Sequence, residues 1–244
     1  MLAVERKNLI YAKLCENGRV LVNDLAEEFG VSDETIRRDL DKLEQEGLAE
    51  KFYGGAIKVE NTFFDLPFHV RQNSNMPEKR KIAELCLPLI HDGDYIAIDS
   101  STTALEIIKA AKSCKNLTVI TNSQRVVDTL APEARFKLIC TGGEYVVRNM
   151  AYFGRIAERT MDHFCPDLAF FASKGVNERG EITDISEEET TMRVAAIKRA
   201  TRSVFLCDKS KTGKTFPHHV AWMKDMDVIV TEADFPAEYL PRKA

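Results

Sequence analysis

The chain has 244 residues, a formal net charge of −4 and 44% hydrophobic residues, which is typical of one large globular domain or of a small domain followed by a medium one. No run of about 18 apolar residues occurs, so no membrane span is expected. The first ten residues lack the apolar core of a secretory signal, and we therefore expect a cytoplasmic protein.

The first two predicted elements are short helices that end at glycines. Residues 5–15 carry an apolar stripe at helical spacing, and Gly18 ends this helix. The next helix lies in "VLVNDLAEEFG", where Asn23 or Asp24 can cap the start and Gly30 is available for the end. The apolar stripe of the first helix consists of Leu9, Ile10 and Leu14, with Ala12 as a further candidate.

A third helix is predicted in "VSDETIRRDLDKL". Ser32 is a candidate N-cap, because two acidic residues follow it in the first turn. Ile36, Leu40 and Leu43 recur at i, i+4 and i+7 and so share one face. At about 100° per residue, Arg38 points away from that face. The order of elements, a helix, a tight glycine-containing turn and a second helix, indicates a helix-turn-helix.

The outward face of the third helix allows two interpretations. An exposed arginine with threonine and lysine nearby suits the DNA major groove, since arginine reaches guanine edges and Thr or Lys reaches bases or phosphates. Alternatively this is a solvated charged face, because Asp39, Asp41 and Glu44 are interleaved. The first sixty residues hold nine Lys or Arg and thirteen Asp or Glu, which counts against a simple basic DNA-binding domain. Under the DNA interpretation, the contact residues are Ser32, Thr35, Arg37, Arg38 and Lys42.

A β-hairpin is predicted directly after the third helix. In "GLAEKFYGGA", Gly47 stops the helix and Gly54–Gly55 form a hairpin turn. A small hairpin after a helix-turn-helix is a wing, and Lys51 and Tyr53 near its tip are candidate contacts to the DNA backbone or minor groove. The wing favours the DNA interpretation of the third helix.

The whole N-terminal segment resembles the winged helix-turn-helix of the DeoR family of bacterial transcriptional regulators. The resemblance runs from "ERKNLI" through "GRVLVNDLAEEFGVSDETIRRDLDKLEQEGLAEKFYGGA" and matches the family pattern at nearly every position. Two positions of the wing depart from it, with Lys51 where arginine is usual and Tyr53 where histidine is usual. The resemblance implies a DNA-binding domain over residues 1–58, of which only the local contact face meets DNA.

A linker is predicted over residues 59–76, because polar residues, aromatics and prolines mix there without a clear period. A new helix begins near Pro77. Four residues of the linker are too apolar for a free tether, so we expect them to dock on one of the domains. These are Phe63, Phe64, Leu66 and Phe68.

From residue 77 on, short apolar runs alternate with helical patterns. This alternation is typical of a mainly parallel sheet with helices on both faces. The predicted fold class is α/β, with an N-terminal winged helix-turn-helix and a C-terminal domain over residues 77–244. The predicted helices are 78–90, 103–113, 155–164 and 189–200, and the predicted strands are 94–100, 116–123, 136–143, 168–176, 203–210 and 227–233.

Polar residues follow three of the predicted strands. In the first case, hydroxyls and backbone N–H groups precede a helix, an arrangement suited to phosphate. Ligands in such sheets bind beyond the carboxyl ends of the strands, so the three polar ends converge on one candidate pocket. For any single strand end ordinary helix capping is the simpler explanation, and it is their joint occurrence that indicates a pocket. The candidate effector-binding residues are Asp99, Ser100, Ser101, Thr102, Thr103, Thr121, Asn122, Ser123, Gly142 and Gly143.

Basic residues that could complete this pocket follow two other strands. Lys174 lies in "SKGV", and Lys211 lies between Lys209 and Lys214 in "CDKSKTGKTF". Glu189, at the start of a late helix, could accept hydrogen bonds from sugar hydroxyls or simply cap that helix.

The second half also resembles the DeoR family over essentially its whole length. The family motifs "D-x-G-T-T", "T-N-S", "G-G" and "D-x-S-K-x-G" appear here as "DSSTT", "TNS", "GG" and "DKSKTG", with "KGV" and Glu189 at the corresponding places. Ser101 replaces the glycine of the first motif, which narrows the phosphate loop or adds a hydroxyl donor. The resemblance implies a sensor domain similar to ribose-5-phosphate isomerase and CoA transferases, which binds a phosphorylated sugar or a related metabolite.

These features predict a transcription factor, a repressor of a carbohydrate-use operon, that binds double-stranded operator DNA as a homo-oligomer and is released by a sugar phosphate. The alternative, from another class of protein, is a sugar-phosphate isomerase with a DNA-binding appendage, in which Asp99, Glu189 and Lys211 act as acid/base groups. The nearly complete winged helix favours regulation, because a sensor that turned over its effector would destroy its own signal.

No cofactor or metal site is predicted. The six cysteines form no CxxC pair and several lie in apolar runs, so we expect reduced, buried side chains. The pair His218–His219 has no third ligand nearby in sequence, which favours a loop pair over a metal site. The cysteines are Cys15, Cys86, Cys114, Cys140, Cys165 and Cys207.

Overall fold

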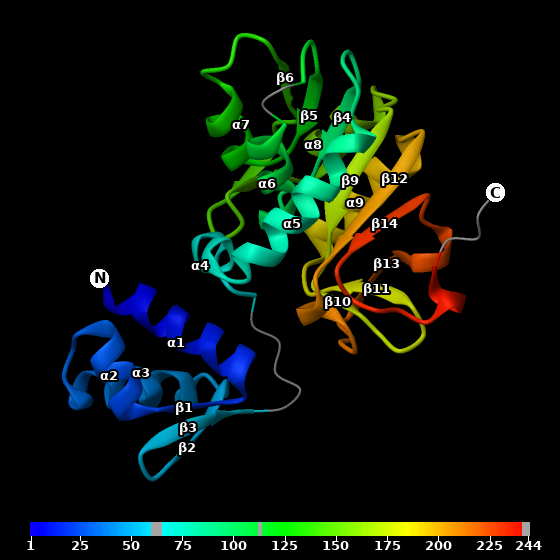
Figure 1. Ribbon diagram of the computed structural model, residues 1–244. Helices are drawn as coiled ribbons and strands as arrows, with labels where there is room; N and C mark the ends of the chain where they lie inside the picture. Colours follow the sequence, from blue (N-terminus) through cyan, green and yellow to red (C-terminus); the bar gives the residue numbers. More distant parts are fainter. Residues whose placement is uncertain (60–64, 112–113, 241–244) are drawn as a thin grey trace. The chain divides into compact units, whose positions relative to one another are not determined.

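The chain divides into two compact units, Met1–Ser74 and Asn75–Ala244, which we call the N-terminal and the C-terminal unit (Figure 1). The division falls inside the segment 59–76 that the sequence predicts as a linker. The structure, a computed structural model, describes residues 1–59, 65–111 and 114–240.

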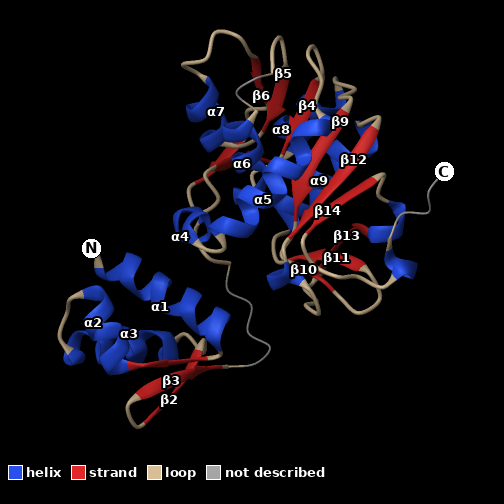
Figure 2. Cartoon of the chain, viewed as in Figure 1, coloured by secondary structure: helices blue, strands red, loops and turns tan. Residues whose placement is uncertain are grey.

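The N-terminal unit is a winged helix-turn-helix, as predicted. Its elements are α1 (Ala3–Asn17), β1 (Arg19–Leu21), α2 (Val22–Phe29), α3 (Asp33–Gln45), β2 (Ala49–Phe52), β3 (Gly55–Lys58) and α4 (Phe68–Asn73). The three strands form an antiparallel sheet in the order β1-β3-β2, and the hairpin of β2 and β3 is the wing (Figure 2).

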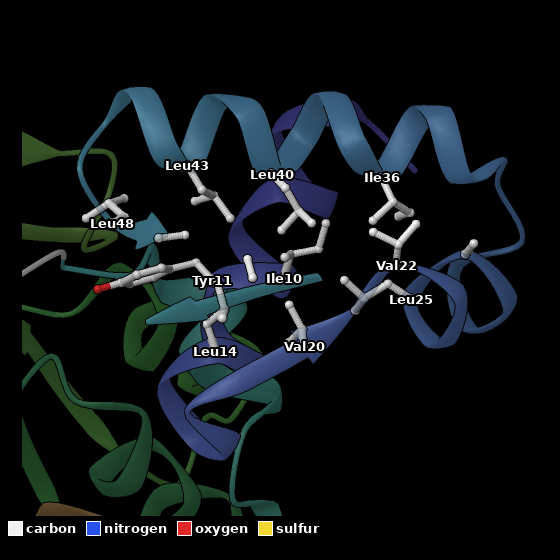
Figure 3. Close-up of a cluster of buried hydrophobic side chains, with 13 residues drawn as sticks. Ile10, Tyr11, Leu14, Val20, Val22, Leu25, Ile36, Leu40, Leu43 and Leu48 are labelled. Atoms are coloured by element: carbon white, nitrogen blue, oxygen red, sulfur yellow. The ribbon is translucent and has the colours of Figure 1, made fainter. Parts of the chain in front are cut away.

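The core of this unit forms where α3 faces α1, α2 and β1, and Figure 3 shows these side chains pointing toward one another. Ile36, Leu40 and Leu43 are at most 1% exposed, which confirms the predicted inward face of α3. The predicted stripe of α1 is partly wrong, because Tyr11 is buried whereas Leu9 is only partly buried. At about 100° per residue, Tyr11 lies on the side of the stripe that faces the core and Leu9 on the other. The other core residues are Ile10, Leu14, Val20, Val22, Leu25, Ala26, Leu48, Ala49 and Ala56.

The helix ends agree with the predicted capping residues at three places. Gly18 and Gly30 are the C-caps of α1 and α2, with left-handed φ angles of 73° and 63° that favour glycine. The Ser32 hydroxyl accepts a hydrogen bond from the Thr35 N–H at 3.3 Å and caps α3.

The predicted cap of α2 is wrong. The helix begins at Val22, before both candidates Asn23 and Asp24, and Leu21 at the N-cap position offers no side-chain cap. The reason lies in the wing, because the Val22 N–H donates to the Gly54 carbonyl oxygen at 2.8 Å. A backbone group of the wing turn thus satisfies an N–H that a side chain would otherwise cap.

The hairpin turn is shifted by one residue from its predicted place. Tyr53 and Gly54 form the turn, and Gly55 is the first residue of β3. A Cβ atom at Gly55 would lie 2.1 Å from the Val20 carbonyl oxygen, so glycine is required where β3 approaches β1.

The predicted linker contains a helix that the sequence analysis missed. Phe68 and Val70 of α4 are each 1% exposed, and α4 contacts α1. Leu66 packs against the core of the N-terminal unit. Docking of Leu66 and Phe68 is therefore confirmed, whereas Phe63 and Phe64 lie outside the described residues.

The C-terminal unit is built on a parallel sheet of six strands, which confirms the predicted fold class. The strand order is β14-β12-β9-β4-β5-β6, and every pair of neighbours is parallel. In Figure 1, α5 and α6 lie in front of this sheet and α8 and α9 behind it. The elements are α5 (Met76–Cys86), η1 (Leu87–Leu89), β4 (Tyr95–Ile98), α6 (Thr102–Ala110), β5 (Thr118–Thr121), α7 (Gln124–Leu130), β6 (Lys137–Cys140), β7 (Glu144–Val146), β8 (Ala151–Phe153), α8 (Arg155–Asp162), β9 (Leu168–Ala172), β10 (Gly175–Val176), β11 (Glu181–Asp184), α9 (Glu187–Arg199), β12 (Arg202–Cys207), η2 (Lys209–Lys211), β13 (His218–Trp222), η3 (Met223–Asp225), β14 (Val228–Thr231) and η4 (Ala237–Tyr239).

The strand order places a topological switch point between β4 and β9. The chain proceeds from β4 to β5 and β6 on one side, and from β9 to β12 and β14 on the other. The connections that leave the carboxyl ends of β4 and β9 therefore diverge, which opens the crevice where ligands bind in sheets of this type.

Two antiparallel elements were not predicted, the hairpin of β7 and β8 and a small sheet in the order β10-β11-β13. The histidine pair lies on β13, so the predicted loop pair is wrong. His219 Nδ1 is 2.9 Å from Glu181 Oε1 across the small sheet. This strand was not predicted because apolar and polar residues alternate only weakly over "HHVAW", and because the strand that it pairs with is distant in sequence.

The cysteines are all free, but their predicted burial is only partly correct. Cys86 and Cys207 are buried, and burial raises the pKa of the Cys86 thiol to about 12. Cys140 and Cys165 are exposed. Cys140 is the last residue of β6, which is the edge strand of the parallel sheet and so lacks a neighbour on one side.

Candidate nucleic-acid interface and effector site

The outward face of α3 carries the predicted basic residues. Arg37, Arg38 and Lys42 are exposed, and the Arg38 side chain retains 73% of its accessible surface. Arg38 Nε lies 3.2 Å from Glu34 Oε1, one turn earlier on the same helix. Such an exposed pair contributes little to stability and leaves the guanidinium free to exchange partners.

Asp39 does not belong to a solvated face. It is 1% exposed, and its Oδ2 lies 2.6 Å from Nε of Arg6 on α1. The pair joins α1 to α3 within the N-terminal unit. Asp39 lies three residues after Ile36 and next to Leu40, so its position on the inward face was visible in the helical period.

Lys51 connects the wing to α3. Its Nζ pairs with Asp41 and lies 3.8 Å from Glu44 Oε2, and its backbone N–H donates to Glu44 Oε1 at 3.0 Å. The hydrogen bond to Asp41 raises the pKa of Lys51. Two of the carboxylates interleaved on α3 are therefore partners of the wing. Tyr53, in the wing turn, is fully exposed.

The loop between β4 and α6 presents free hydrogen-bond donors. Ser101 is the N-cap of α6, and its hydroxyl accepts from the Ala104 N–H at 3.1 Å. Within the described part of the chain, the backbone N–H groups of Ser100, Thr102 and Thr103 have no hydrogen-bond partner. Unpartnered N–H groups at a helix N-terminus form a site for an anion such as phosphate.

Asp99 and Glu189 belong to a buried charged cluster that the sequence analysis missed. Three carboxylates surround the guanidinium of Arg193, which lies on α9 and is 2% exposed. Arg193 Nε is 2.9 Å from Asp99, Nη1 is 2.6 Å from Asp184 and Nη2 is 3.2 Å from Glu189. We call these four residues the Arg193 cluster.

Burial and mutual pairing set the charge states of this cluster. Burial raises the pKa of Asp99, although Arg193 and Ser101 oppose that shift. Burial alone would lower the pKa of Arg193, but the three carboxylates outweigh it and raise the pKa. The guanidinium is thus always charged, and it is the group that makes burial of several carboxylates tolerable.

Glu189 does not cap α9, and its carboxylate is paired within the protein. Its carboxylate accepts from Arg193 and from Asn149 Nδ2, the latter at 2.8 Å, and the residue is 1% exposed. The cap of α9 is Ser186, whose hydroxyl accepts from the Glu189 N–H at 3.1 Å. The only sequence signal for the cluster was the i, i+4 spacing of Glu189 and Arg193 on one helix.

The segment after β5 is tied to neighbouring backbone. The Thr121 hydroxyl donates to the Ile98 carbonyl at 2.7 Å, and Asn122 Nδ2 donates to the Tyr152 carbonyl at 3.1 Å. The Ser123 hydroxyl caps α7. These hydrogen bonds hold the end of β5 to residues of β4 and β8.

Two glycines follow β6, and the second of them, Gly143, permits a close backbone approach. Gly142 and Gly143 have φ angles of 65° and 116°. A Cβ atom at Gly143 would lie 2.4 Å from the Phe153 carbonyl oxygen, so no other residue fits there.

The two candidate lysines follow β9 and β12, which are neighbours in the sheet. The Lys174 N–H donates to Asp184 Oδ2 at 3.2 Å, beside the Arg193 cluster. The loop that carries Lys211 is fixed to β10 by a bridge between Val176 and Thr212. The structure thus brings Lys174 and the 209–214 loop to the same end of the sheet as the β4–α6 loop.

No group of three or more His, Cys, Asp or Glu side chains that could hold a metal ion occurs among the described residues. In the same part of the chain, no helix is both long enough and apolar enough to cross a membrane.

Both units match known family models. One, described as the DeoR-like helix-turn-helix domain, matches residues 6–62, and the other, described as the DeoR C terminal sensor domain, matches residues 74–233. The two matches together cover most of the chain.

Solved structures similar to the chain include two enzymes. Ribose 5-phosphate isomerase A from Methanocaldococcus jannaschii is similar over 57% of this chain and 55% of its own, with 20% identity and a TM-score of 0.41. A 4-hydroxybutyrate CoA-transferase from Porphyromonas gingivalis is similar over 64% and 46%, with 12% identity and a TM-score of 0.42.

Relatives named as transcriptional regulators match almost the whole chain. The uncharacterized HTH-type transcriptional regulator YulB of Bacillus subtilis is 30% identical over 96% of this chain and 90% of its own length. The putative aga operon transcriptional repressor of Escherichia coli O157:H7 is 29% identical over 97% and 88%. The L-fucose operon activator of Haemophilus influenzae is 28% identical over 95% and 92%. With both family models and full-length relatives in agreement, the chain belongs to the DeoR family of transcriptional regulators.

Proposed function

We propose that this regulator represses a carbohydrate-utilisation operon and is released from its operator by a phosphorylated sugar. The observation that carries the proposal is the pairing, in one chain, of an exposed arginine face on α3 with a loop of unpartnered N–H groups at the end of β4. The first suits DNA and the second suits phosphate. The names of the relatives, an aga operon repressor and an L-fucose operon activator, support a sugar operon as the target.

On the DNA side, we propose that α3 enters the major groove. Arg37, Arg38 and Lys42 would meet bases and phosphates, with Ser32 and Thr35 at the N-terminal end of the helix and Tyr53 on the wing. Lys51 would act by holding the wing against α3, as its pairing with Asp41 indicates. The protein would bind as a homo-oligomer, because paired half-sites multiply affinity.

Arg38→Ala is expected to weaken specific operator binding by about 1–3 kcal/mol if this side chain reads a guanine. Folding should be nearly unchanged, because the side chain is exposed and its pair with Glu34 is solvated. The measurement is a binding titration at fixed salt on a duplex that the wild type selects from random-sequence DNA. The matched control is Arg179→Ala, an exposed arginine of the C-terminal unit that is likewise 3.2 Å from a glutamate. If Arg38→Ala binds the duplex as tightly as the wild type does, Arg38 does not contribute to specific operator binding.

On the effector side, we propose that phosphate binds the segment from Asp99 to Thr103, through the free N–H groups of Ser100, Thr102 and Thr103. Lys174 and Lys211 would supply positive charge. Asn122, Gly142 and Gly143 would shape the sugar subsite. Asp99 and Glu189 would act indirectly, because the Arg193 cluster occupies their carboxylates.

Lys211→Ala is expected to weaken effector binding about ten- to a hundredfold, because it removes a charge-assisted contact of about 1.5–3 kcal/mol. Operator affinity without effector should hardly change, since the winged helix is untouched. The variant should therefore stay on DNA at effector concentrations that release the wild type. An operator gel shift titrated with effector measures this, with the exposed Lys115→Ala as control. Release at the wild-type concentration would place the pocket elsewhere.

The effector class is tested by a thermal-shift screen of inorganic phosphate and of aldose, ketose and polyol phosphates. A ligand at 100 times its Kd should stabilise the protein by about 2.7 kcal/mol. The same panel, incubated with the protein and assayed for product, tests the isomerase alternative. We propose that no compound is converted, because the carboxylates of Asp99 and Glu189 that an isomerase would use are both paired with Arg193.

A further inference from the structure

The two units are joined at a residue with an uncommon backbone conformation. Asn75 is the first residue of the C-terminal unit and the N-cap of α5, and its φ and ψ angles are 51° and 41°. This left-handed region is disfavoured for residues other than glycine, although asparagine enters it more readily than most. Such a conformation persists only where the surroundings hold it in place.

Asn75 is held by a loop that is distant in sequence. Its Nδ2 donates to the Ser210 Oγ at 3.1 Å, and its carbonyl oxygen accepts from the Lys79 N–H at 3.1 Å. The Ser210 hydroxyl donates its own proton to the Asp208 carboxylate, which leaves a lone pair for Asn75. The direction in which the chain leaves the C-terminal unit therefore depends on the position of Ser210.

Ser210 shares a single turn with the candidate effector lysine. Asp208 caps η2, accepting from the Ser210 N–H at 2.9 Å, and its carbonyl oxygen accepts from the Lys211 N–H at 3.0 Å. Because the turn has only three residues, Lys211 cannot move far without moving Ser210.

We propose that the hydrogen bond between Asn75 and Ser210 couples the effector site to the N-terminal unit. This inference rests on the proposed function, since it takes Lys211 as an effector contact. Effector binding at Lys211 displaces η2, and Asn75 then loses its partner and relaxes toward the extended region. The change in φ at Asn75 redirects the chain at Ser74, next to α4 and the winged helix. The effector thus favours the arrangement without the hydrogen bond, which is the differential interaction that coupling requires.

Ser210→Ala tests the proposal without any effector. Loss of the hydrogen bond should mimic the effector-bound arrangement and weaken operator binding about two- to tenfold, the factor that corresponds to one hydrogen bond. The probe is the duplex selected by the wild type. Asn75→Ala should have an effect of similar size or larger, because it removes the same hydrogen bond and alanine also disfavours the left-handed region. The double variant should bind no more weakly than Asn75→Ala alone, because both substitutions remove the same contact.

The matched control is Thr212→Ala. The Thr212 hydroxyl donates to the Lys209 carbonyl at 2.9 Å in the same loop, and this variant should bind the duplex within about twofold of wild type. Melting temperatures of all variants check the fold. Hydrogen exchange of the Lys79 amide, whose acceptor is the Asn75 carbonyl, should be faster in Ser210→Ala and in the Asn75 variant but not in Thr212→Ala.

The outcomes separate this inference from the proposed function. If the wild type selects no duplex, the proposed DNA-binding role itself fails. If the wild type selects a duplex and Ser210→Ala binds it as tightly, with additive effects in the double variant, the coupling role of Asn75 and Ser210 is wrong while the proposed function stands.

Discussion

Arg193→Met is expected to destabilise the C-terminal unit by about 3–5 kcal/mol, because it leaves buried carboxylates without their shared cation. Arg193 is 2% exposed and bonds Asp99, Asp184 and Glu189, which come from the end of β4, the end of β11 and α9. The stability lost in Arg193→Met should become smaller as the pH falls, because protonation of the carboxylates removes the buried negative charges that Arg193 balances. Urea unfolding monitored over a range of pH measures both effects.

Two variants sharpen this test. Arg193→Lys keeps the charge but cannot reach three carboxylates with a planar fork, so its stability should fall between those of the methionine variant and the wild type. Arg199→Met removes an arginine of the same helix that bonds the Phe164 carbonyl at an exposed position, and it should change stability by less than about 1 kcal/mol. An Arg193→Met protein with the wild-type urea midpoint would show that the cluster has no stabilising role.

Leu40→Ala is expected to destabilise the N-terminal unit by about 2–5 kcal/mol through the lost side chain and the cavity left behind. Leu40 is 1% exposed and lies between Ile36 and Leu43 in the core (Figure 3). DNA binding should be lost while the C-terminal unit keeps its effector affinity, because the two units have separate cores. Calorimetric unfolding should therefore show the N-terminal transition moved to lower temperature and the other unchanged.

Val4→Ala is the control for Leu40. Val4 lies on α1 of the same unit but is 67% exposed, so its truncation should change stability by no more than about 0.5 kcal/mol. Normal melting and normal DNA binding of Leu40→Ala would mean that α3 is oriented differently from Figure 3.

Local patterns were enough to predict the helix-turn-helix. The spacing of Ile36, Leu40 and Leu43, the Ser32 cap and the C-terminal Gly30 all depend on residues within one or two turns. The parallel sheet was also predicted from local patterns, since each buried strand is a short apolar run between two helical patterns.

Contacts between distant segments were not predictable from these patterns. The Arg193 cluster forms only when β4, β11 and α9 come together in the fold. The hydrophobic periodicity of each segment does not predict this contact. The cap of α2 was missed because its N–H is satisfied by Gly54 of the wing, more than thirty residues later. The helix α4 was not predicted because its six residues are too few to show an amphipathic period.

The strand ends that carry the candidate site were located from sequence, whereas the pairing of their side chains was not. The polar ends of β4, β5 and β6 were located correctly, because a parallel sheet gathers the carboxyl ends of its strands at one edge. Asp99 and Glu189 were assigned to the effector from their places in the sequence and in the family motifs, and only the fold shows that their carboxylates face Arg193.

We propose that one chain binds operator DNA through α3 and releases it when a phosphorylated sugar occupies the C-terminal unit. The most direct measurement is an operator gel shift on the duplex selected by the wild type, titrated with the compound that stabilises the protein most in the thermal-shift screen. We expect the compound to weaken wild-type operator binding by roughly 5- to 150-fold, the usual range of such coupling, and we expect Lys211→Ala to need much more compound for the same effect. Tight binding of the compound with operator affinity unchanged would contradict it.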